Sequence, residues 1–418
     1  MAVSSARKSA AQRTAKKPAK KPAKKPVTKS AKKAAAKPAP RPAKRSSGNG
    51  AAKLKRINLA LQGGGAHGAF TWGVLDRLLE DERLQIEGIS GTSAGAMNAV
   101  VLAEGFARDG RAGARRALDR FWQRISEFSA FSPIRANPLD KLLGNWNIDK
   151  TPGAIWFDLM SRMFSPSDFN PLHLNPLRDV LAESINFVAL QDCDPIKLFI
   201  SATNVRTGKI RVFQRHDVTI DALLASACLP EAFEAVEIGG DPYWDGGFMG
   251  NPAIFPLIYG CESRDVVIVQ INPLVREGTP RSAAEIADRL NEITFNSALR
   301  GEMRAIAFVQ KLIESDQVHG KGIDRLRKMH IHLIGDPDHM KGLGSASKFN
   351  ADIDFLNALK QIGRDRATGW LETTFDALGR RSSINIGEVF LSDGDAEAGG
   401  SETRPSAVKA LRPLAGAR

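Results

Sequence analysis

Three short motifs in this sequence carry residue types that hydrolytic chemistry uses. The first, GGGAHG at residues 63–68, follows an apolar strand pattern and opens a helical pattern. Glycines at such a junction present free backbone N–H groups, which hold negative charge at a helix N-terminus. The same spacing satisfies G-x-G-x-x-G, the dinucleotide fingerprint. The anion is therefore either the pyrophosphate of a cofactor or an oxyanion that exists only during catalysis.

The second motif, GTSAG at residues 91–95, is G-x-S-x-G. A strand pattern ends directly before it and an Ala-rich helix pattern begins at Ala94. This is the setting in which a serine is held on a strained elbow with its Oγ exposed. Side chains in place of Gly91 and Gly95 would collide with the neighbouring strand and helix. The pattern favours Ser93 as a nucleophile over a serine in a structural turn.

A nucleophilic serine needs donors for the oxyanion of its tetrahedral intermediate. The N–H groups of Gly63, Gly64 and Gly65 meet that need, with the N–H of Ala94 as their partner. The dinucleotide interpretation instead needs an acidic residue at the end of the second strand. Its candidate, Glu87, stands at the start of that strand, so the oxyanion interpretation is favoured.

The third motif, DGG at residues 245–247, offers a general base. Because Asp-Gly pairs are also common in turns, Asp245 alone indicates little. Gly246 and Gly247 would let the carboxylate approach Ser93 directly. It would then accept the serine proton and return it to the leaving alcohol, after which water attacks the acyl-enzyme.

A Ser-Asp-His triad is the alternative to this dyad, because four histidines follow Asp245 in the chain. Two of them alternate within the strand pattern MHIHLIG and one stands in the loop DPDHM. Histidines in such places are usually partly exposed packing residues, so the dyad is favoured. The four are His319, His330, His332 and His339.

Taken in order, GGGAHG, GTSAG and DGG resemble the motifs of the patatin-like phospholipase family, lipid acyl hydrolases that use a Ser-Asp dyad. The segment SACLPEAF at residues 226–233 is similar to that family's small-residue helix and Pro-containing turn. The resemblance covers residues 57–259. It implies that Ser93 is the nucleophile, Asp245 the base and residues 63–65 the oxyanion loop, and that no metal or organic cofactor is needed.

One position departs from the family pattern. The glycine loop of the family often has Arg or Lys where this sequence has His67, followed here by Gly68. The dyad and the glycines are intact, but the charge that Arg or Lys would offer to an oxyanion or a phosphate headgroup is missing from the loop. Because histidine titrates near neutrality, His67 predicts a pH dependence. A solvent-facing histidine at the helix N-terminus is the alternative.

Strand and helix patterns alternate around these motifs, which predicts a three-layer α/β/α sandwich with a mainly parallel central sheet. We expect a catalytic domain over residues 55–260, and C-terminal strands and helices over 261–392 that complete the same globular body. The strand patterns cover residues 57–62, 86–90, 197–204, 209–213, 265–271 and 329–334. The helix patterns cover residues 66–79, 94–107, 114–127, 175–184, 220–227, 282–314 and 351–376.

The region 128–176 predicts an insertion on this scaffold, because its loops are rich in Asn and Pro. Within it, GAIWFDLMSRMF at residues 153–164 presents aromatic and aliphatic side chains with few charges. Such a helix suits a lid or an interface-seeking element at the mouth of an acyl pocket. A packed core helix explains the same pattern and is slightly favoured.

The formal charge of +13 is concentrated at the N-terminus. Residues 1–50 contain 16 Lys and Arg and no Asp or Glu, so the remaining residues carry −3. Repeats such as KKPAKKPAKKP offer nothing apolar to bury, and we expect a disordered basic tail. The small and polar residues of 393–418 predict a second flexible terminus.

The tail suits several partners: DNA or RNA phosphates, anionic lipid headgroups or another polyanion. Its Ala/Lys/Pro repeats resemble the tails of linker-histone-like proteins. A solvated charge run without a dedicated partner is an equal alternative. Because the tail contains no aromatic residue to stack on bases, we expect any nucleic-acid binding to be non-specific.

Composition points to a cytoplasmic protein, with contact to membranes or polyanions only at their surface. Cys193, Cys228 and Cys261 show no metal-like spacing, which favours reduced thiols. No apolar run is long enough for a transmembrane segment, and the basic N-terminus is not followed by a signal-like apolar stretch.

The function expected from these features is hydrolysis of acyl-lipid esters. Two alternatives stay open. One is a non-catalytic polyanion-binding or architectural protein on a hydrolase-like scaffold. The other is an intracellular polyester or short-chain ester hydrolase, because the motifs define the reaction and leave the acyl group open.

Overall fold

A computed structural model describes residues 54–128, 168, 175–192, 196–315 and 326–392. The predicted basic tail 1–50, the flexible C-terminus 393–418 and Cys193 lie outside the described residues. So do His319 and nearly all of the predicted insertion 128–176, including the apolar stretch 153–164.

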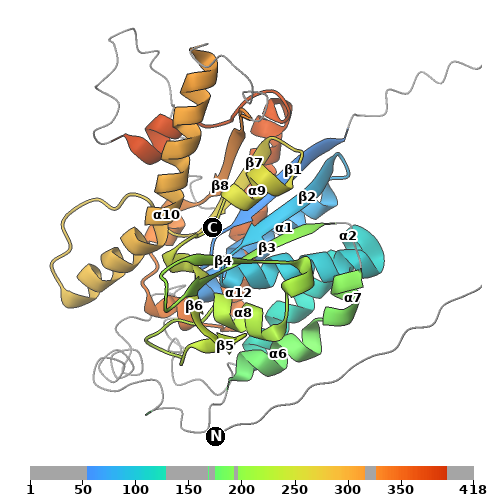
Figure 1. Cartoon of the computed structure of the whole chain (residues 1–418), viewed down its shortest axis with the longest axis vertical. Helices are drawn as coiled ribbons and strands as arrows, with labels where there is room; N and C mark the ends of the chain where they lie inside the picture. The colour runs from blue at the N-terminus through green and yellow to red at the C-terminus, as the bar shows by residue number, and fades with distance from the viewer. Residues whose placement is uncertain (1–53, 129–167, 169–174, 193–195, 316–325, 393–418) are drawn as a thin grey trace, which may run out of the picture. The chain divides into compact units, whose positions relative to one another are not determined.

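The described strands form one eight-stranded sheet in the order β5-β6-β3-β2-β1-β7-β8, with β4 also paired to β3 (Figure 1). The pairs β1–β2, β2–β3, β1–β7 and β7–β8 are parallel, and β4, β5 and β6 join antiparallel. The predicted three-layer fold with a mainly parallel sheet is confirmed. The strands are β1 (Lys55–Leu61), β2 (Leu84–Gly91), β3 (Lys197–Asn204), β4 (Ile210–Gln214), β5 (Val236–Ile238), β6 (Asp241–Asp245), β7 (Asp265–Gln270) and β8 (His330–Gly335).

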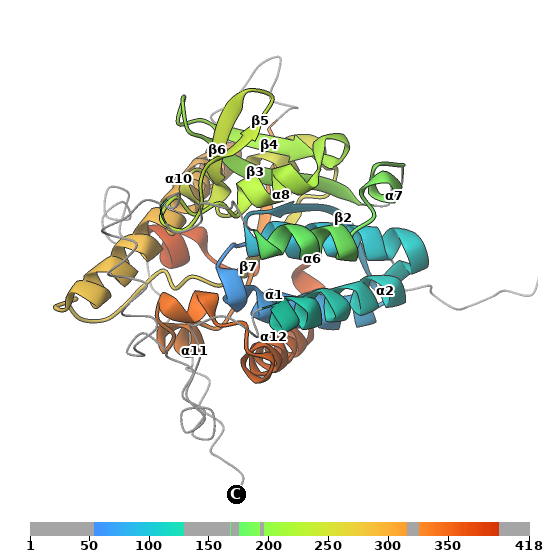
Figure 2. The ribbon, with the colours of Figure 1, turned by 90° about the horizontal axis from the view of Figure 1, so that it is seen from below.

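Helices cover both faces of this sheet, which is why its central strands are nearly continuous apolar runs. In β7, Val267 and Val269 belong to the core under α1, α2 and α12, whereas Val266 and Ile268 belong to the core under α9 and α10. Figure 2 shows α1 and α12 side by side on one side of the strands. The helices are α1 (Gly68–Glu80), α2 (Ala94–Phe128), α6 (Pro176–Ser184), α7 (Phe187–Asp192), α8 (Ile220–Ser226), α9 (Phe255–Gly260), α10 (Ala283–Glu314), α11 (Pro337–Lys341) and α12 (Ile353–Thr374).

The long helices lie where the sequence predicts them, with ends set by capping. Ser282 and Glu285 form a reciprocal capping box at the start of α10, and Asn175 caps α6. The two helices predicted over 94–107 and 114–127 are halves of α2, because Asp109 and Gly110 leave the helical conformation between them.

The bounds of two strands were not predicted, for physical reasons. β5 has three residues, too few to show an alternating pattern, and β6 contains Pro242, which is unfavourable inside a sheet. β6 matters because its last residue is Asp245.

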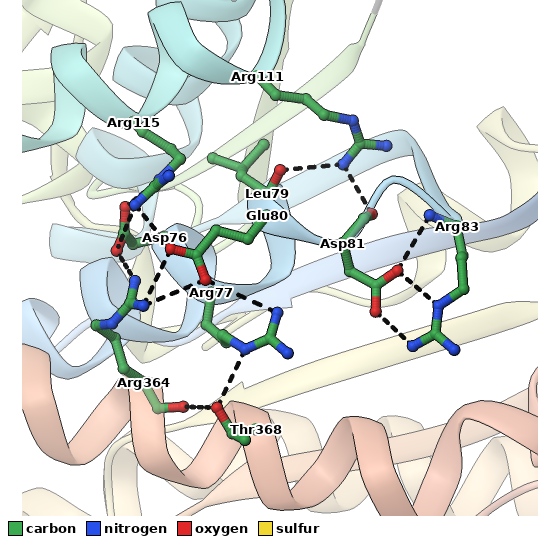
Figure 3. A network of polar contacts seen from close by, with 10 residues as sticks. All are labelled: Asp76, Arg77, Leu79, Glu80, Asp81, Arg83, Arg111, Arg115, Arg364 and Thr368. Carbon is green, nitrogen blue, oxygen red and sulfur yellow. Dashed lines mark hydrogen bonds and ion pairs between the residues drawn. The ribbon is translucent and has the colours of Figure 1, made fainter.

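An ion-pair network joins α1 to α2 and α12 (Figure 3). The buried carboxylate of Asp76 pairs with Arg115 at 2.6 Å and also with Arg364, and both arginines reach Glu80 as well. The network fixes the helix that begins at the glycine loop against the helix that follows the predicted nucleophile. Over the described part of the chain, no helix combines the length and apolarity needed to cross a bilayer.

Candidate active site

Ser93 lies at a sharp turn between β2 and α2, with φ of +53°. It is the one non-glycine residue with positive φ in the described part of the chain, and such a conformation costs about 1 kcal/mol or more. The flanking glycines permit the turn. A Cβ on Gly95 would lie 2.3 Å from the Leu61 carbonyl oxygen of β1, and a Cβ on Gly91 would lie 2.6 Å from the carbonyl oxygen of Gly95.

The topology brings Asp245 to this turn. β3 pairs with β4 along one edge, so β2 and β6 share the other edge. β2 ends with Gly91 opposite Ile200, and β6 arrives from the opposite direction and ends with Asp245 opposite Ala202. The two strands therefore meet end to end beside β3, and the residues that follow them face the same space.

The Asp245 carboxyl is buried, with 1% of the residue exposed. Burial raises its pKa to about 7, and hydrogen bonds from the Gly247 N–H and the Ser93 hydroxyl partly offset this effect. The Gly247 bond measures 2.7 Å. A Cβ on Gly246 would lie 2.1 Å from the Ser201 carbonyl oxygen, so only glycine lets the chain turn this closely against β3. A carboxyl with this pKa exchanges protons near neutrality.

The glycine loop 63–65 packs against the elbow, since a Cβ on Gly63 would lie 2.7 Å from the Ser93 Cβ. The N–H of Gly63 already donates to Asn251 Oδ1 at 2.6 Å. No hydrogen bond among the described residues engages the N–H of Gly64, Gly65 or Ala94. Of the four N–H groups expected to face an oxyanion, that of Gly63 is therefore already engaged by Asn251.

Buried amides fix this loop from behind. Gln62 Oε1 accepts the N–H groups of Ile271 and Asn272 at 2.9 Å each, and the Gln62 amide donates to the Asn251 carbonyl and to Asn296 Oδ1 at 3.1 Å each. Asn272 Nδ2 donates to the Gly63 carbonyl at 2.9 Å. Both polar groups of Gly63 are thereby held by side chains, so the position of the loop is rigidly set.

Ser226, the last residue of α8, supports the candidate nucleophile itself. Its Oγ accepts the Ser93 N–H at 3.0 Å. The next turn places Cys228, whose carbonyl accepts the Asp245 N–H at 2.8 Å. Burial raises the pKa of the Cys228 thiol to about 12, so it stays protonated at neutral pH. Segment 226–233, singled out by its sequence, thus holds the backbone on both sides of the candidate dyad.

A cavity of about 230 Å³ opens over Ser93 and Asp245. Gly64, Gly65 and Ala94 also line it, so the free N–H groups and both side chains meet one space. Asn291 and Lys348 are the further polar residues on its wall. The apolar wall suits an acyl chain. It includes Met97, Phe121, Trp122, Ile125, Leu177, Leu229, Phe233 and Phe295.

His67 does not line this cavity and is not solvent-facing, because only 4% of the residue is exposed. The Ser347 Oγ donates its proton to the Gly344 carbonyl at 2.6 Å, so His67 Nε2 is the donor to the Ser347 Oγ at 2.7 Å. Burial, with the charge of Lys348, lowers the pKa of His67 to about 3. At neutral pH the ring is therefore uncharged, and the prediction that His67 titrates near neutrality is wrong.

The three described candidates for a triad histidine lie away from the cavity. His330 and His332 both contact Asp265 Oδ1, at 3.2 and 3.0 Å, where β7 and β8 begin, and they are buried rather than partly exposed. His339 contacts Asp336 at 2.8 Å. Asp245 and Ser93 thus meet without a described imidazole between them.

Glu87, the acidic residue that the dinucleotide interpretation would need, is also engaged elsewhere. It accepts the N–H groups of Glu262 and Ser263 at 2.7 and 2.9 Å and pairs with Lys197 at 3.0 Å. In the described residues no group of three His, Cys, Asp or Glu side chains is arranged to hold a metal ion.

Sequence reasoning missed several polar residues of this site. Asn251 stands in an Asn-Pro pair, which indicates only a turn, and Gln62 precedes the glycines without belonging to a motif. Asn291 lies in α10 and Lys348 follows α11, far along the chain from either motif. No local pattern marks these two, because their role depends on how the chain folds back.

The chain was compared with family models, solved structures and curated proteins, and the family model agrees with this architecture. A family model described as patatin-like phospholipase matches residues 59–258, and the mainly parallel sheet flanked by helices is consistent with the patatin fold. Among solved structures, VipD from Legionella pneumophila is 16% identical, with a TM-score of 0.36, 77% of this chain covered and 67% of that chain. The ExoU–SpcU complex from the type III secretion system of Pseudomonas aeruginosa gives 16% identity and a TM-score of 0.31, with 78% of this chain and 52% of that chain covered. Comparison with curated proteins gives no match.

Proposed function

Because residues 59–258 form a patatin-like phospholipase domain, we propose that this chain is a serine acyl hydrolase that cleaves carboxylic esters of phospholipids or related acyl lipids. The observation that carries the proposal is the strained elbow of Ser93, with its hydroxyl bonded to a carboxyl of raised pKa at the floor of an apolar cavity. The residue types, their order and their surroundings agree with one reaction.

In this proposal Asp245 is the general base. Its carboxylate accepts the proton of the Ser93 hydroxyl while Oγ bonds to the ester carbonyl carbon. The carbonyl oxygen becomes an oxyanion, and the free N–H groups of Gly64, Gly65 and Ala94 are placed to stabilise it. The proton then passes from Asp245 to the leaving alcohol, which departs as the acyl-enzyme forms.

Water completes the cycle in the same site. Asp245, again ionised, takes a proton from the water that attacks the acyl-enzyme, and returns it to Ser93 Oγ as the acid leaves. The aromatic and aliphatic wall from α2 and α6 holds the acyl chain through this second step. Three preorganised N–H donors supply the charge stabilisation, which is usually the largest contribution in acyl transfer.

Two variants with matched controls test the dyad. Ser93→Ala should abolish labelling by a fluorophosphonate and lower ester hydrolysis by about 10³-fold or more. Asp245→Asn, which preserves the shape, should lower the labelling rate by a similar factor. Ser297→Ala and Asp241→Asn are the controls, because Ser297 is exposed on α10 and Asp241 pairs with Arg206 at the surface. Labelling of Ser93→Ala, or parent-like hydrolysis by Asp245→Asn, would contradict the proposal.

The substrate class is tested on a panel of phospholipids, short-chain esters and a polyester. The motifs define the reaction, so activity confined to short-chain or polymeric esters would select that alternative. Absence of any Ser93-dependent hydrolysis would favour a non-catalytic scaffold. For the basic tail we keep the proposal of non-specific polyanion or lipid-surface binding, and a salt titration with and without residues 1–50 decides it.

A further inference from the structure

Lys348 brings a positive charge to the cavity from beyond the segment that matches the family model. It lies in the short 3-10 helix Ala346–Phe349, which packs directly on the glycine loop. A Cβ on Gly65 would lie 2.3 Å from the Lys348 carbonyl oxygen, so the backbones of the two residues touch. The side chain lines the cavity together with Ser93 and Asp245.

The ammonium group of Lys348 has no acidic partner. Its Nζ donates to Asn291 Oδ1 at 2.8 Å and lies 5.7 Å from the centre of the Phe295 ring. Among the described residues, no carboxylate comes within ion-pair distance of it. Three acids act on its charge from a distance, Glu292 most strongly, then Asp288 and Asp245. Glu292 is itself paired with Arg276 at 2.8 Å and with Arg289 at 3.2 Å.

Such an arrangement is costly unless an anion compensates for it. Burial lowers the pKa of Lys348, which indicates that its charge is poorly solvated. An ammonium has three donors, and one of them is used by Asn291. Lys348 is also the one cationic residue on the described wall of the cavity, so an anion that enters will face it.

The polar side chains of the cavity beyond Ser93 and Asp245 come from one part of the fold. α2 and α6 contribute only apolar side chains, whereas Asn291 and Lys348 come from α10 and the segment after α11, together with the rings of Phe295 and Phe349. Figure 2 shows α10 and α11 on the opposite side of the view from α2 and α6. A substrate that carries an acyl chain and an anionic group can place each against its matching wall, with the ester over Ser93.

We propose that Lys348, oriented by Asn291, binds the phosphate of a glycerophospholipid in the catalytic cavity and so selects phosphodiester substrates over neutral esters of the same acyl chain. This inference rests on the proposed hydrolase function and names the feature of the substrate that the site recognises. Lysine binds phosphate through a compact positive charge that carries several hydrogen-bond donors. The oxyanion has its own donors in the glycine loop, so the ammonium is free for the headgroup.

The test compares two soluble substrates with the same chains, dihexanoyl phosphatidylglycerol and dihexanoylglycerol. In Lys348→Met the ratio of kcat/KM between phospholipid and neutral lipid should fall about tenfold or more, through KM of the phospholipid. Lys348→Arg keeps the charge and should recover most of the ratio. Lys311→Met is the matched control, because Lys311 is exposed on α10.

An equal loss on both substrates would overturn the inference, since it would mean that Lys348 acts on the oxyanion or on the fold. So would an unchanged ratio. A second experiment measures how well inorganic phosphate protects Ser93 from the fluorophosphonate. Protection of Ser93 from fluorophosphonate by inorganic phosphate as strongly as by the lipid phosphate would show a free-phosphate site and overturn the headgroup assignment.

Binding separates this inference from the proposed function. A dihexyl ether analogue of the phospholipid cannot be hydrolysed, and Trp122 in the cavity wall reports its entry by fluorescence. Lys348→Met should weaken binding of the ether phospholipid about tenfold, and binding of the neutral ether lipid much less. If the parent cleaves no ester but this difference holds, the hydrolase proposal falls and the phosphate site stands. If Ser93-dependent hydrolysis holds without the difference, the phosphate site alone falls.

Discussion

Asn251 accepts the N–H of Gly63 with 2.6 Å between N and Oδ1, and this bond ties the glycine loop to the segment that follows Asp245. Thr92 donates to the Gly250 carbonyl at 2.6 Å from the other side. The elbow, the glycine loop and the turn after the proposed base therefore share one hydrogen-bonded frame. A change in the frame should move the oxyanion donors while leaving the dyad chemically intact.

Asn251→Ala should consequently lower kcat by about 10- to 100-fold with little change in KM, because the loop is mispositioned only where charge develops. The pH profile should keep its inflection, since Asp245 is untouched, and that distinguishes a positioning role from general unfolding. Steady-state kinetics across pH and a thermal melt measure both. A rise in KM at unchanged kcat would assign Asn251 to substrate binding instead.

Activity should depend on the ionisation of Asp245. Burial raises the pKa of this carboxyl to about 7, and only the ionised form accepts the Ser93 proton. The kcat/KM for a neutral soluble ester should therefore increase with pH and level off above about 7. His67, with a pKa of about 3, contributes no inflection there. An inflection near 4, the ordinary range of an aspartate, would remove Asp245 as the base.

The same pKa predicts an effect on stability. In the unfolded chain Asp245 ionises near 3.8, and in the folded protein near 7, so between these values the folded state holds a proton that the unfolded state has lost. The contribution of Asp245 to stability is greatest below about pH 4 and is lost as pH rises through 7. Asp245→Asn should thus raise Tm by a few degrees at pH 8 relative to the parent, and not at pH 4. Asp241→Asn, at the exposed end of β6, should leave the difference between the two pH values unchanged.

The geometry of the turn at Ser93 was predictable from the sequence, because the glycines that permit this turn stand beside it in the chain. Gly91 is needed for a close contact within the elbow and Gly95 for one with the neighbouring strand β1, and such needs leave a motif. Asp245 was found through its glycines, although the bounds of its strand β6 were not predicted. The polar residues that complete the site carry no such signal. Lys348 contacts the glycine loop although it stands more than 280 positions further along the chain. The hydrogen-bond partner of the buried His67 is Ser347, in the same distant segment.

The ion pairs of Figure 3 predict a stability effect away from the site. Asp76 is buried under Arg115 and Arg364, so Asp76→Ala leaves two arginines with only Glu80. We expect a loss of about 3 kcal/mol in the free energy of unfolding, measured by urea denaturation. Glu262→Ala is the control, because Glu262 pairs with Arg56 at an exposed position and should change little. Equal effects of the two variants would contradict this account.

The contact between Gly65 and Lys348 gives a prediction that separates backbone strain from collision. Gly65 and Gly110 both have a positive φ, of +58° and +51°. Alanine at either position costs about 1–2 kcal/mol for the positive φ. Only Gly65→Ala adds a Cβ that would lie 2.3 Å from a backbone oxygen, whereas nothing lies within 4 Å of a Cβ on Gly110.

The collision in Gly65→Ala must displace the segment that carries Lys348 or the loop that carries the proposed oxyanion donors. Gly65→Ala should therefore lower kcat/KM by about 100-fold. It should also lower the free energy of unfolding more than Gly110→Ala does. Gly110→Ala should retain the activity of the parent. Steady-state kinetics and urea denaturation of the two variants measure these effects. Parent-like hydrolysis by Gly65→Ala would contradict the prediction, because it would mean that the loop accommodates a Cβ beside the Lys348 carbonyl.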